Sequence, residues 1–194
     1  MIRALAAALS TLALASAAPA NAPRAERHAP IAQPVSLEPG DIVFIGVDGA
    51  FWADLASASS DQRFGHVGIA ARDERGRMLI VHAGGAPDRD NAPVVAELFP
   101  VFAADASRVG IYRASDRLAA ERAAHNALNY ARSGAQFDGA FSLETRDRLY
   151  CTELVWRAYD ERIARPSTMG TRAVIALRDI ERSDAFEQIA VRER

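Results

Sequence analysis

The stretch that most constrains this chain begins at its only cysteine, Cys151. Apolar residues follow it at offsets of three, four, seven and eight positions: Leu154, Val155, Ala158 and Tyr159. This spacing places all of them on one face of an α-helix. The sequence therefore predicts an amphipathic helix that begins at Cys151, runs to about Ile163 and packs its apolar face, the cysteine included, against another layer.

A cysteine at the start of a helix has two readings. The unpaired N–H groups there favour negative charge and so favour a thiolate. A nearby His or Arg lowers the pKa of such cysteines to roughly 3.5–7.5, which makes them nucleophiles. The alternative is a small apolar side chain that fills a core. The rest of the sequence has to decide between the two.

The N-terminus has the pattern of a secretory signal over residues 1–20. Arg3 gives a short positive region, an Ala- and Leu-rich run follows, and Ala18-Pro19-Ala20 fits the small-x-small cleavage rule. The run is too weakly apolar for a membrane anchor, so we expect cleavage after Ala20 and a periplasmic or secreted protein without stable membrane insertion. A lone thiol in such an oxidising compartment must be buried or used, which favours a functional Cys151.

The mature chain divides into a leader and one domain. Residues 21–38 are rich in Pro, Ala and Arg, and we expect a flexible leader in which His28 is solvated. Residues 39–194 are enough for one domain with a sizeable core.

Composition excludes several classes of function. The 23 basic and 25 acidic residues nearly balance, so no nucleic-acid partner or anionic membrane is expected. All basic residues are arginine, which excludes a lysine nucleophile and a P-loop. The pattern contains no Cys/His cluster and no glycine-rich phosphate loop, so no cofactor is expected.

Short apolar runs bounded by turn residues predict a small antiparallel sheet. The runs that read as strands are Ile42–Val47, Gly65–Ala71, Met78–Ala83 and Arg108–Arg113. Helical spacing predicts helices over Ala50–Ser59 (containing Phe51 and Trp52, the latter expected in the core), Arg117–Arg132 and Asp179–Ile189. The segment Gly84–Ala96 reads as a loop, and the state of Glu97–Phe102 stays open.

The helix over residues 117–132 carries its own start signal. Asp116 precedes it as a helix cap. Its expected inner stripe consists of Leu118, Ala123, Ala124, Ala127, Leu128 and Ala131. His125 falls on the opposite face, and we expect it to be solvated.

Two histidines lie on neighbouring predicted strands. His66 begins one strand, His82 ends the next, and the turn Asp73–Arg77 joins them. An antiparallel hairpin brings both to the same edge of the sheet. A third metal ligand is not evident, so we expect no metal site there.

These residues match the needs of a cysteine hydrolase. Such an enzyme requires a thiolate, a histidine that holds and passes the proton, and a polar group that orients the histidine. Cys151, His66 and His82 fill these roles in that order. The chain order of nucleophile and base is not fixed by the chemistry.

The motifs also resemble a known family, the circularly permuted papain-like hydrolases of the YiiX/YebB type, a branch of the NlpC superfamily. The matching segments occur in the family's order: Pro39–Phe44, Gly65–Ile69, Val81–Ala83, Phe137–Asp138 and Tyr150–Val155. The resemblance implies an α+β, permuted papain-like fold. It also implies Cys151 as nucleophile and His66 as its partner.

The chain departs from the family pattern at the third position. The family usually has Glu where this chain has His82, and Gly65 replaces the common Ser. A histidine there is similar to the lecithin retinol acyltransferase-like relatives. A neutral His lacks the charge of a carboxylate and would stabilise the imidazolium less. Asp138 and Glu153 are similar to the family, but we interpret them as structural.

The resulting prediction is an exported cysteine hydrolase that cleaves an amide through an acyl-enzyme. The expected substrates are small peptides, with cell-wall fragments favoured by the predicted export. One alternative is a hydrolase or acyltransferase that acts on a lipid-like substrate, which His82 suggests. Another is a degenerate, non-catalytic binding domain, which the loss of the usual Glu suggests.

Overall fold

A computed structural model of the protein describes residues 31–46, 63–84 and 91–194. The predicted signal, His28 and the predicted helix Ala50–Ser59 with Trp52 lie outside these residues. So do residues 85–90 of the predicted loop.

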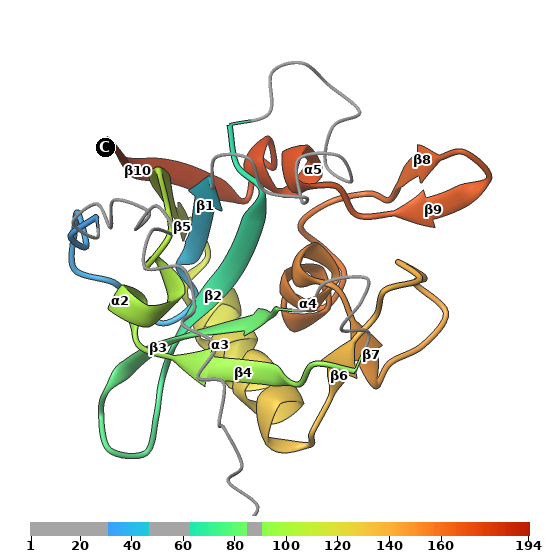
Figure 1. Ribbon diagram of the computed structural model, residues 1–194, viewed down its shortest axis with the longest axis horizontal. Helices are drawn as coiled ribbons and strands as arrows, with labels where there is room; N and C mark the ends of the chain where they lie inside the picture. The colour runs from blue at the N-terminus through green and yellow to red at the C-terminus, as the bar shows by residue number, and fades with distance from the viewer. Residues whose placement is uncertain (1–30, 47–62, 85–90) are drawn as a thin grey trace, which may run out of the picture.

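The centre of the fold is a six-stranded antiparallel sheet in the order β10-β5-β1-β2-β3-β4 (Figure 1). Its strands are β1 Ile42–Gly46, β2 His66–Arg72, β3 Met78–Ala83, β4 Val94–Glu97, β5 Arg108–Ala114 and β10 Phe186–Glu193. The predicted α+β class and antiparallel sheet are confirmed, and β3 has the predicted bounds. The turn between β2 and β3 is held by Asp73, whose Oδ1 accepts the N–H groups of Arg75 and Arg77.

Helices cover both faces of the sheet. On one face, α3 (Arg117–Arg132) and α4 (Cys151–Ala158) pack against alternate residues of the strands, among them Ile69 and Val81. On the other face, the short α2 (Phe99–Phe102) packs over the intervening residues. Apolar side chains just before β1 join this second cluster, because Ile31 and Leu37 are buried in it.

The helix α3 begins and ends as its sequence predicts. Asp116 caps it by accepting the N–H of Ala119. The predicted stripe is buried at its centre but not at its start, because Leu118 is 69% exposed. Leu118 lies in the first turn, where Ala120 is buried instead. His125 is exposed, as predicted, and its Nδ1 is 3.1 Å from the Asn129 side-chain amide.

The helix that starts at Cys151 is shorter than predicted, since α4 ends at Ala158 rather than near Ile163. Asp160 and Glu161 take positive φ values of 56° and 62°, the left-handed conformation that ends helices. The apolar spacing continues past this point in the sequence, but the last turn folds back on itself, with the Glu161 N–H donating to the Trp156 carbonyl at 2.9 Å.

The C-terminal prediction was wrong. Instead of one helix over Asp179–Ile189, the chain forms α5 (Leu177–Glu181) and then the strand β10. The strand pairs along the whole of β5, which would otherwise be a bare edge of the sheet. The predicted loop Gly84–Ala96 likewise contains the first residues of β4, which pairs with β3.

Two small strand pairs complete the described residues. β6 (Gln136–Phe137) runs parallel to β7 (Arg148–Leu149), which leads directly into α4. β8 (Ser167–Met169) and β9 (Arg172–Val174) form a hairpin that precedes α5. Within the described part of the chain, no helix has the length and apolar character that a membrane span requires.

Candidate active site

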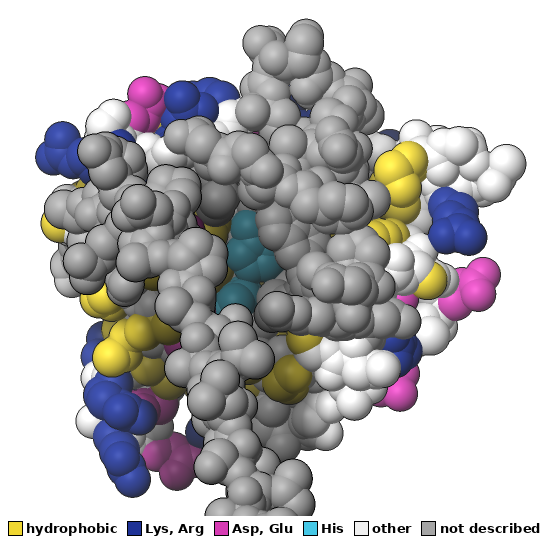
Figure 2. Space-filling model, in the orientation of Figure 1, with side chains coloured by type: hydrophobic (Ala, Val, Ile, Leu, Met, Phe, Trp, Pro, Cys, Tyr) yellow, Lys and Arg dark blue, Asp and Glu magenta, His cyan; other side chains and the backbone are white. Residues whose placement is uncertain are grey.

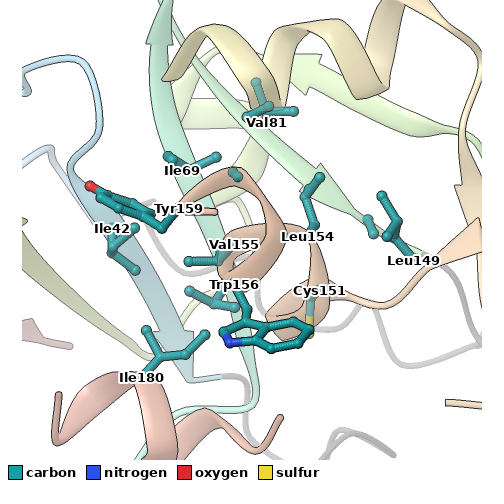
Figure 3. Packing of buried hydrophobic residues seen from close by; sticks show 14 of the residues in the cluster. Ile42, Ile69, Val81, Leu149, Cys151, Leu154, Val155, Trp156, Tyr159 and Ile180 are labelled. Carbon is teal, nitrogen blue, oxygen red and sulfur yellow. The ribbon is translucent and has the colours of Figure 1, made fainter. Parts of the chain in front are cut away.

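Cys151 is the first residue of α4, a helix whose eight residues are all buried (Figure 3). Tyr150 is its N-cap residue, with extended backbone. The thiol therefore lies at the positive end of the helix dipole, with an exposed fraction of only 9%. The buried reading and the functional reading of this cysteine are both compatible with its position.

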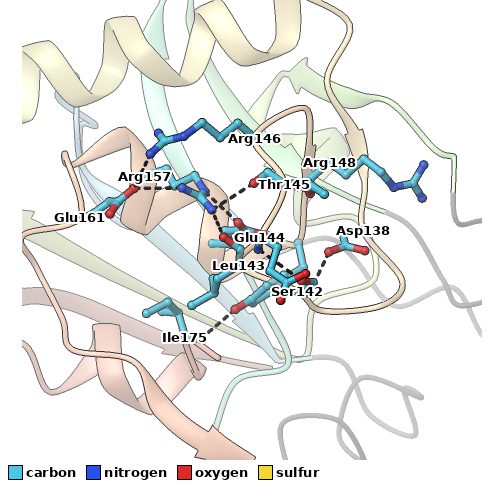
Figure 4. Close-up of polar contacts among 12 residues, drawn as sticks. Asp138, Ser142, Leu143, Glu144, Thr145, Arg146, Arg148, Arg157, Glu161 and Ile175 are labelled. Atoms are coloured by element: carbon cyan, nitrogen blue, oxygen red, sulfur yellow. Dashed lines mark hydrogen bonds and ion pairs between the residues drawn. The ribbon is translucent and has the colours of Figure 1, made fainter. Parts of the chain in front are cut away.

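Arg157 satisfies most of the polar groups that α4 buries in the core, although Glu153 Oε2 has no hydrogen-bond partner among the described residues (Figure 4). Arg157 donates to Glu153 Oε1 at 2.7 Å and to the carbonyls of Leu143 and Thr145 at 2.7 and 3.0 Å. Burial raises the pKa of Glu153 to about 7, against the opposing effect of Arg157. As predicted, Glu153 has a structural role, in that it ties α4 to the loop before β7 through Arg157.

The start of α4 is fixed to the segment that follows β9. The Ile175 N–H donates to the Tyr150 hydroxyl at 2.8 Å, and the Thr152 hydroxyl donates to the Ile175 carbonyl. Asp138 also acts as predicted, because its carboxylate accepts the N–H groups of Ala140 and Ser142 and closes a turn. The residues on either side of Cys151, Tyr150 and Thr152, are thus both held by hydrogen bonds to Ile175.

The sulfur meets the sheet where β2 and β3 separate. The ladder between these strands ends at the Ile69–Val81 pair, although β2 begins three residues earlier, at His66. In this section β2 pairs with β1 but not with β3. The backbone N–H of Val67 there interacts with the Cys151 sulfur, as do those of Thr152 and Cys151 itself. Gly65 lines a pocket together with Cys151. His66 therefore lies between Val67, whose N–H interacts with the sulfur, and Gly65, which lines the same pocket as Cys151.

The two predicted histidines meet, and a third residue joins them. His66 Nε2 is 2.9 Å from His82 Nδ1, and His82 Nε2 is 3.0 Å from Glu97 Oε1. The prediction that a hairpin brings His66 and His82 to one edge of the sheet is confirmed. Figure 2 shows histidine side chains on one face of the molecule.

Two glycines make room for this pair. A Cβ at Gly68 would lie 3.3 Å from His82 Cβ and 2.5 Å from the Ile80 side chain. A Cβ at Gly84 would lie 2.8 Å from His82 Cε1. On the other side Phe102 covers both rings, with ring centroids 5.6 Å from His66 and 5.0 Å from His82. The imidazoles are therefore confined and largely shielded from water.

Burial keeps the reacting groups neutral. It raises the pKa of Cys151 to about 11, although three backbone N–H groups oppose the shift. It lowers the pKa of His66 to about 3, and nearby His82 adds to the effect. It also lowers the pKa of His82, against the opposing influence of Glu97. In this conformation burial therefore disfavours the resting thiolate that the sequence predicts, because desolvation outweighs the helix start.

Sequence reasoning missed Glu97, whose position was left without a role. It is the last residue of β4, two places beyond the residue opposite His82. On one face of an antiparallel pair such diagonal neighbours lie within reach of long side chains. A single carboxylate in the apolar run from Val94 to Phe102 was the available signal. It needed the strand pairing to become informative.

An apolar pocket opens beside Cys151, between the β8–β9 hairpin and α5. Among the described residues its walls are mostly apolar or aromatic: Phe141, Tyr150, Met169, Val174, Ile175 and Leu177. Arg178 also borders it. A group bound in the pocket would reach the sulfur. In the described residues no three His, Cys, Asp or Glu side chains are grouped so as to hold a metal ion.

Comparisons with known proteins bear on the fold and on the family. A crystal structure of the metalloprotein yiiX from Escherichia coli O157:H7 superimposes with a TM-score of 0.65 at 16% identity, covering 81% of this chain and 98% of that one. That likeness shows the fold. A search of curated proteins found no match. The family model of permuted papain-like amidases, YaeF/YiiX, matches residues 36–184. The chain therefore belongs to the permuted papain-like amidases of the YaeF/YiiX, C92 family, a family of cysteine hydrolases.

Proposed function

We propose that this protein is an exported amidase in which Cys151 is the nucleophile and His66 its proton carrier. The observation that carries the proposal is the Val67 N–H at the Cys151 sulfur, because Val67 directly follows His66 in β2. The link from His66 to His82 at 2.9 Å supplies the orienting contact that such a base needs. Family membership supports an enzyme over a degenerate binding domain.

The neutral resting pair determines how the reaction begins. His66 uses Nε2 for His82, so Nδ1 is the ring nitrogen for the cysteine. As the sulfur attacks the amide carbonyl, the thiol proton moves to His66 Nδ1 and a C–S bond forms. The Cys151 N–H at the helix start helps to stabilise the oxyanion.

The second half releases both products. The C–N bond breaks as His66 returns its proton to the leaving amine, which leaves an acyl group on Cys151. Water then attacks the acyl-enzyme with His66 as general base, the C–S bond breaks, and the free acid departs with the thiol restored.

We propose cell-wall peptides as the first substrate class to test, because residues 1–20 have the pattern of a secretory signal. The protein is incubated with peptidoglycan fragments, and the newly formed amines and acids are identified by mass spectrometry. Wild type should release both, and Cys151→Ala and His66→Ala should not. Equal release by all three would contradict the proposal. Sequencing the N-terminus of the exported protein tests cleavage after Ala20.

The apolar pocket favours a second candidate, an amide or ester with an apolar acyl group. Walls such as Met169, Val174 and Leu177 would stabilise an acyl chain by about 0.8 kcal/mol for each buried methylene. A series of N-acyl aminocoumarins with two to twelve carbons tests it. If kcat/KM rises with chain length and Val174→Asp abolishes the rise, the acyl group binds in this pocket. A flat series would exclude this candidate and leave the peptide substrates.

A further inference from the structure

We propose that Glu97 is a positioning residue that fixes which nitrogens of His82 and His66 carry protons. The three residues form one chain of contacts across neighbouring strands. His66 on β2 is 2.9 Å from His82 on β3, and His82 is 3.0 Å from Glu97 on β4.

The direction of each hydrogen bond follows from the carboxylate at one end. A carboxylate only accepts hydrogen bonds, so His82 Nε2 must carry a proton. A neutral imidazole has one N–H, which leaves His82 Nδ1 as an acceptor. His66 must then donate from Nε2, and its Nδ1 is left as the basic nitrogen. Nδ1 is the nitrogen that the proposed mechanism assigns to the Cys151 proton.

The surroundings make this choice of tautomer matter. Among the described residues, the titratable groups that contact His82 are His66 from β2 and Glu97 from β4, while Phe102 of α2 presents an uncharged ring. The His82 side chain is only 12% exposed and that of Glu97 is 29% exposed. Burial lowers the pKa of both histidines, so each is neutral at pH 7 and its tautomer is well defined.

Glu97 also supplies the charge that His82 lacks. When His66 takes up the cysteine proton it becomes a buried cation, and a neutral His82 stabilises that cation only weakly. The carboxylate lies one ring further away and polarises His82 toward His66. The pair Glu97–His82 thus takes the place of the single Glu that the family usually has where this chain has His82.

Nitrogen-15 NMR of the histidines tests the tautomers without any substrate. Signals of the four histidines are assigned with single His→Gln variants of the full chain. In wild type at pH 7, His66 and His82 should both be protonated at Nε2. Glu97→Leu, which removes the acceptor at similar size, should shift part of both populations to the Nδ1–H form. Unchanged tautomers in Glu97→Leu would overturn the proposal.

Kinetics separate the acceptor from the charge, and the activity measurements, unlike the NMR, rest on the proposed function. Glu97→Gln keeps an acceptor but loses the charge, so kcat should fall about 10-fold, whereas Glu97→Leu should lose about 100-fold. KM should not change, and Glu97→Asp should restore part of kcat. The control is Glu121→Leu, at a 52% exposed glutamate on α3, which should keep full activity.

A double variant shows whether Glu97 acts through His82. In a His82→Glu background a carboxylate contacts His66 directly, so Glu97→Leu should cost nothing further, and removal of a like charge should even favour activity. A full 100-fold loss in that background would contradict the proposal. If the tautomers shift as expected but no amide is cleaved, the inference on Glu97 stands and the proposed reaction fails.

Discussion

At the scale of single residues, desolvation decides the state of the site. A helix start and three backbone N–H groups favour a thiolate at Cys151, yet burial raises the pKa of the thiol to about 11. A neutral thiol is less prone to oxidation than a thiolate, which would suit the lone cysteine of the exported protein that we propose. In the mechanism that we propose, the thiolate is therefore generated during attack rather than held in advance.

The pH dependence of alkylation tests the neutral thiol. We expect the rate of Cys151 alkylation by iodoacetamide to rise with pH and to reach no plateau below about pH 9, because the folded protein disfavours the thiolate. The unfolded protein, with its free-cysteine pKa of about 8.5, is the control. A plateau near pH 5–6 that His66→Ala abolishes would instead indicate a resting thiolate–imidazolium pair.

Gly84 matters to the site because it has no side chain next to the His82 ring. An added Cβ would lie 2.8 Å from His82 Cε1 and 2.9 Å from Nδ1, so Gly84→Ala should displace the ring from His66. We expect kcat to fall about 100-fold, the effect of a misplacement of about 1 Å, with the far-UV circular dichroism unchanged.

The control for Gly84 is Gly76, in the turn between β2 and β3. Its φ of 78° strains any other residue, but no atom lies within 4 Å of an added Cβ. Gly76→Ala should lower the melting temperature and leave kcat unaffected. If both variants keep wild-type kcat, the ring tolerates the added methyl group and the packing argument fails.

At the scale of elements, α4 is a buried helix stabilised by one arginine. Arg157 joins Glu153 to the carbonyls of Leu143 and Thr145, which belong to the loop before β7. The side chains of Arg157 and Glu153 are 4% and 0% exposed. Such a pair orders the loop and the helix together.

Removal of this arginine should be costly. Arg157→Ala leaves a buried carboxylate and two carbonyls without their donor, and we expect the free energy of unfolding to fall by about 3–5 kcal/mol in urea titrations. The control is Arg132→Ala, whose pair with Glu74 has side chains 48% and 84% exposed and should contribute less than about 1 kcal/mol. Comparable small losses in both variants would show that the buried pair adds little.

At the scale of the whole molecule, the buried histidines link stability to pH. The pKa of His66 is about 3 in the folded protein and about 6.5 when unfolded. Between these values the unfolded chain binds a proton that the folded protein does not. The free energy of unfolding should therefore fall as the pH is lowered from about 6.5, by about 1.4 kcal/mol per pH unit for this one proton.

Urea titrations of wild type and His66→Asn at pH 7, 6, 5 and 4 measure this effect. The wild-type slope against pH should exceed that of the variant by about one proton. Glu153 acts in the opposite direction in both proteins, because its raised pKa of about 7 makes the folded state bind a proton between about pH 4.5 and 7. Identical slopes would show that His66 is not neutral in the folded protein.

Much of the fold could be predicted because local patterns decide it. Short apolar runs between turn residues favour strands, and β1, β2, β3 and β5 were predicted nearly to the residue on this basis. The Asp116 cap and the period of α3 were equally local. The sequence missed elements whose state or end depends on tertiary contacts. The segment β10 is a strand because β5 offers an open edge for pairing. The helix α4 is shorter than predicted because the chain folds back at Glu161.

The sequence by itself determined the chemistry of this protein, namely a lone cysteine at a helix start and two histidines on a hairpin. Only the tertiary structure decided whether the thiol and the imidazoles are charged, and which residue holds His82 in place. Whether a thiol is charged depends on how much water reaches it, and burial is a property of the packed molecule. Glu97 reaches His82 because β4 pairs with β3 in one register, a contact between residues 15 positions apart that no local pattern encodes.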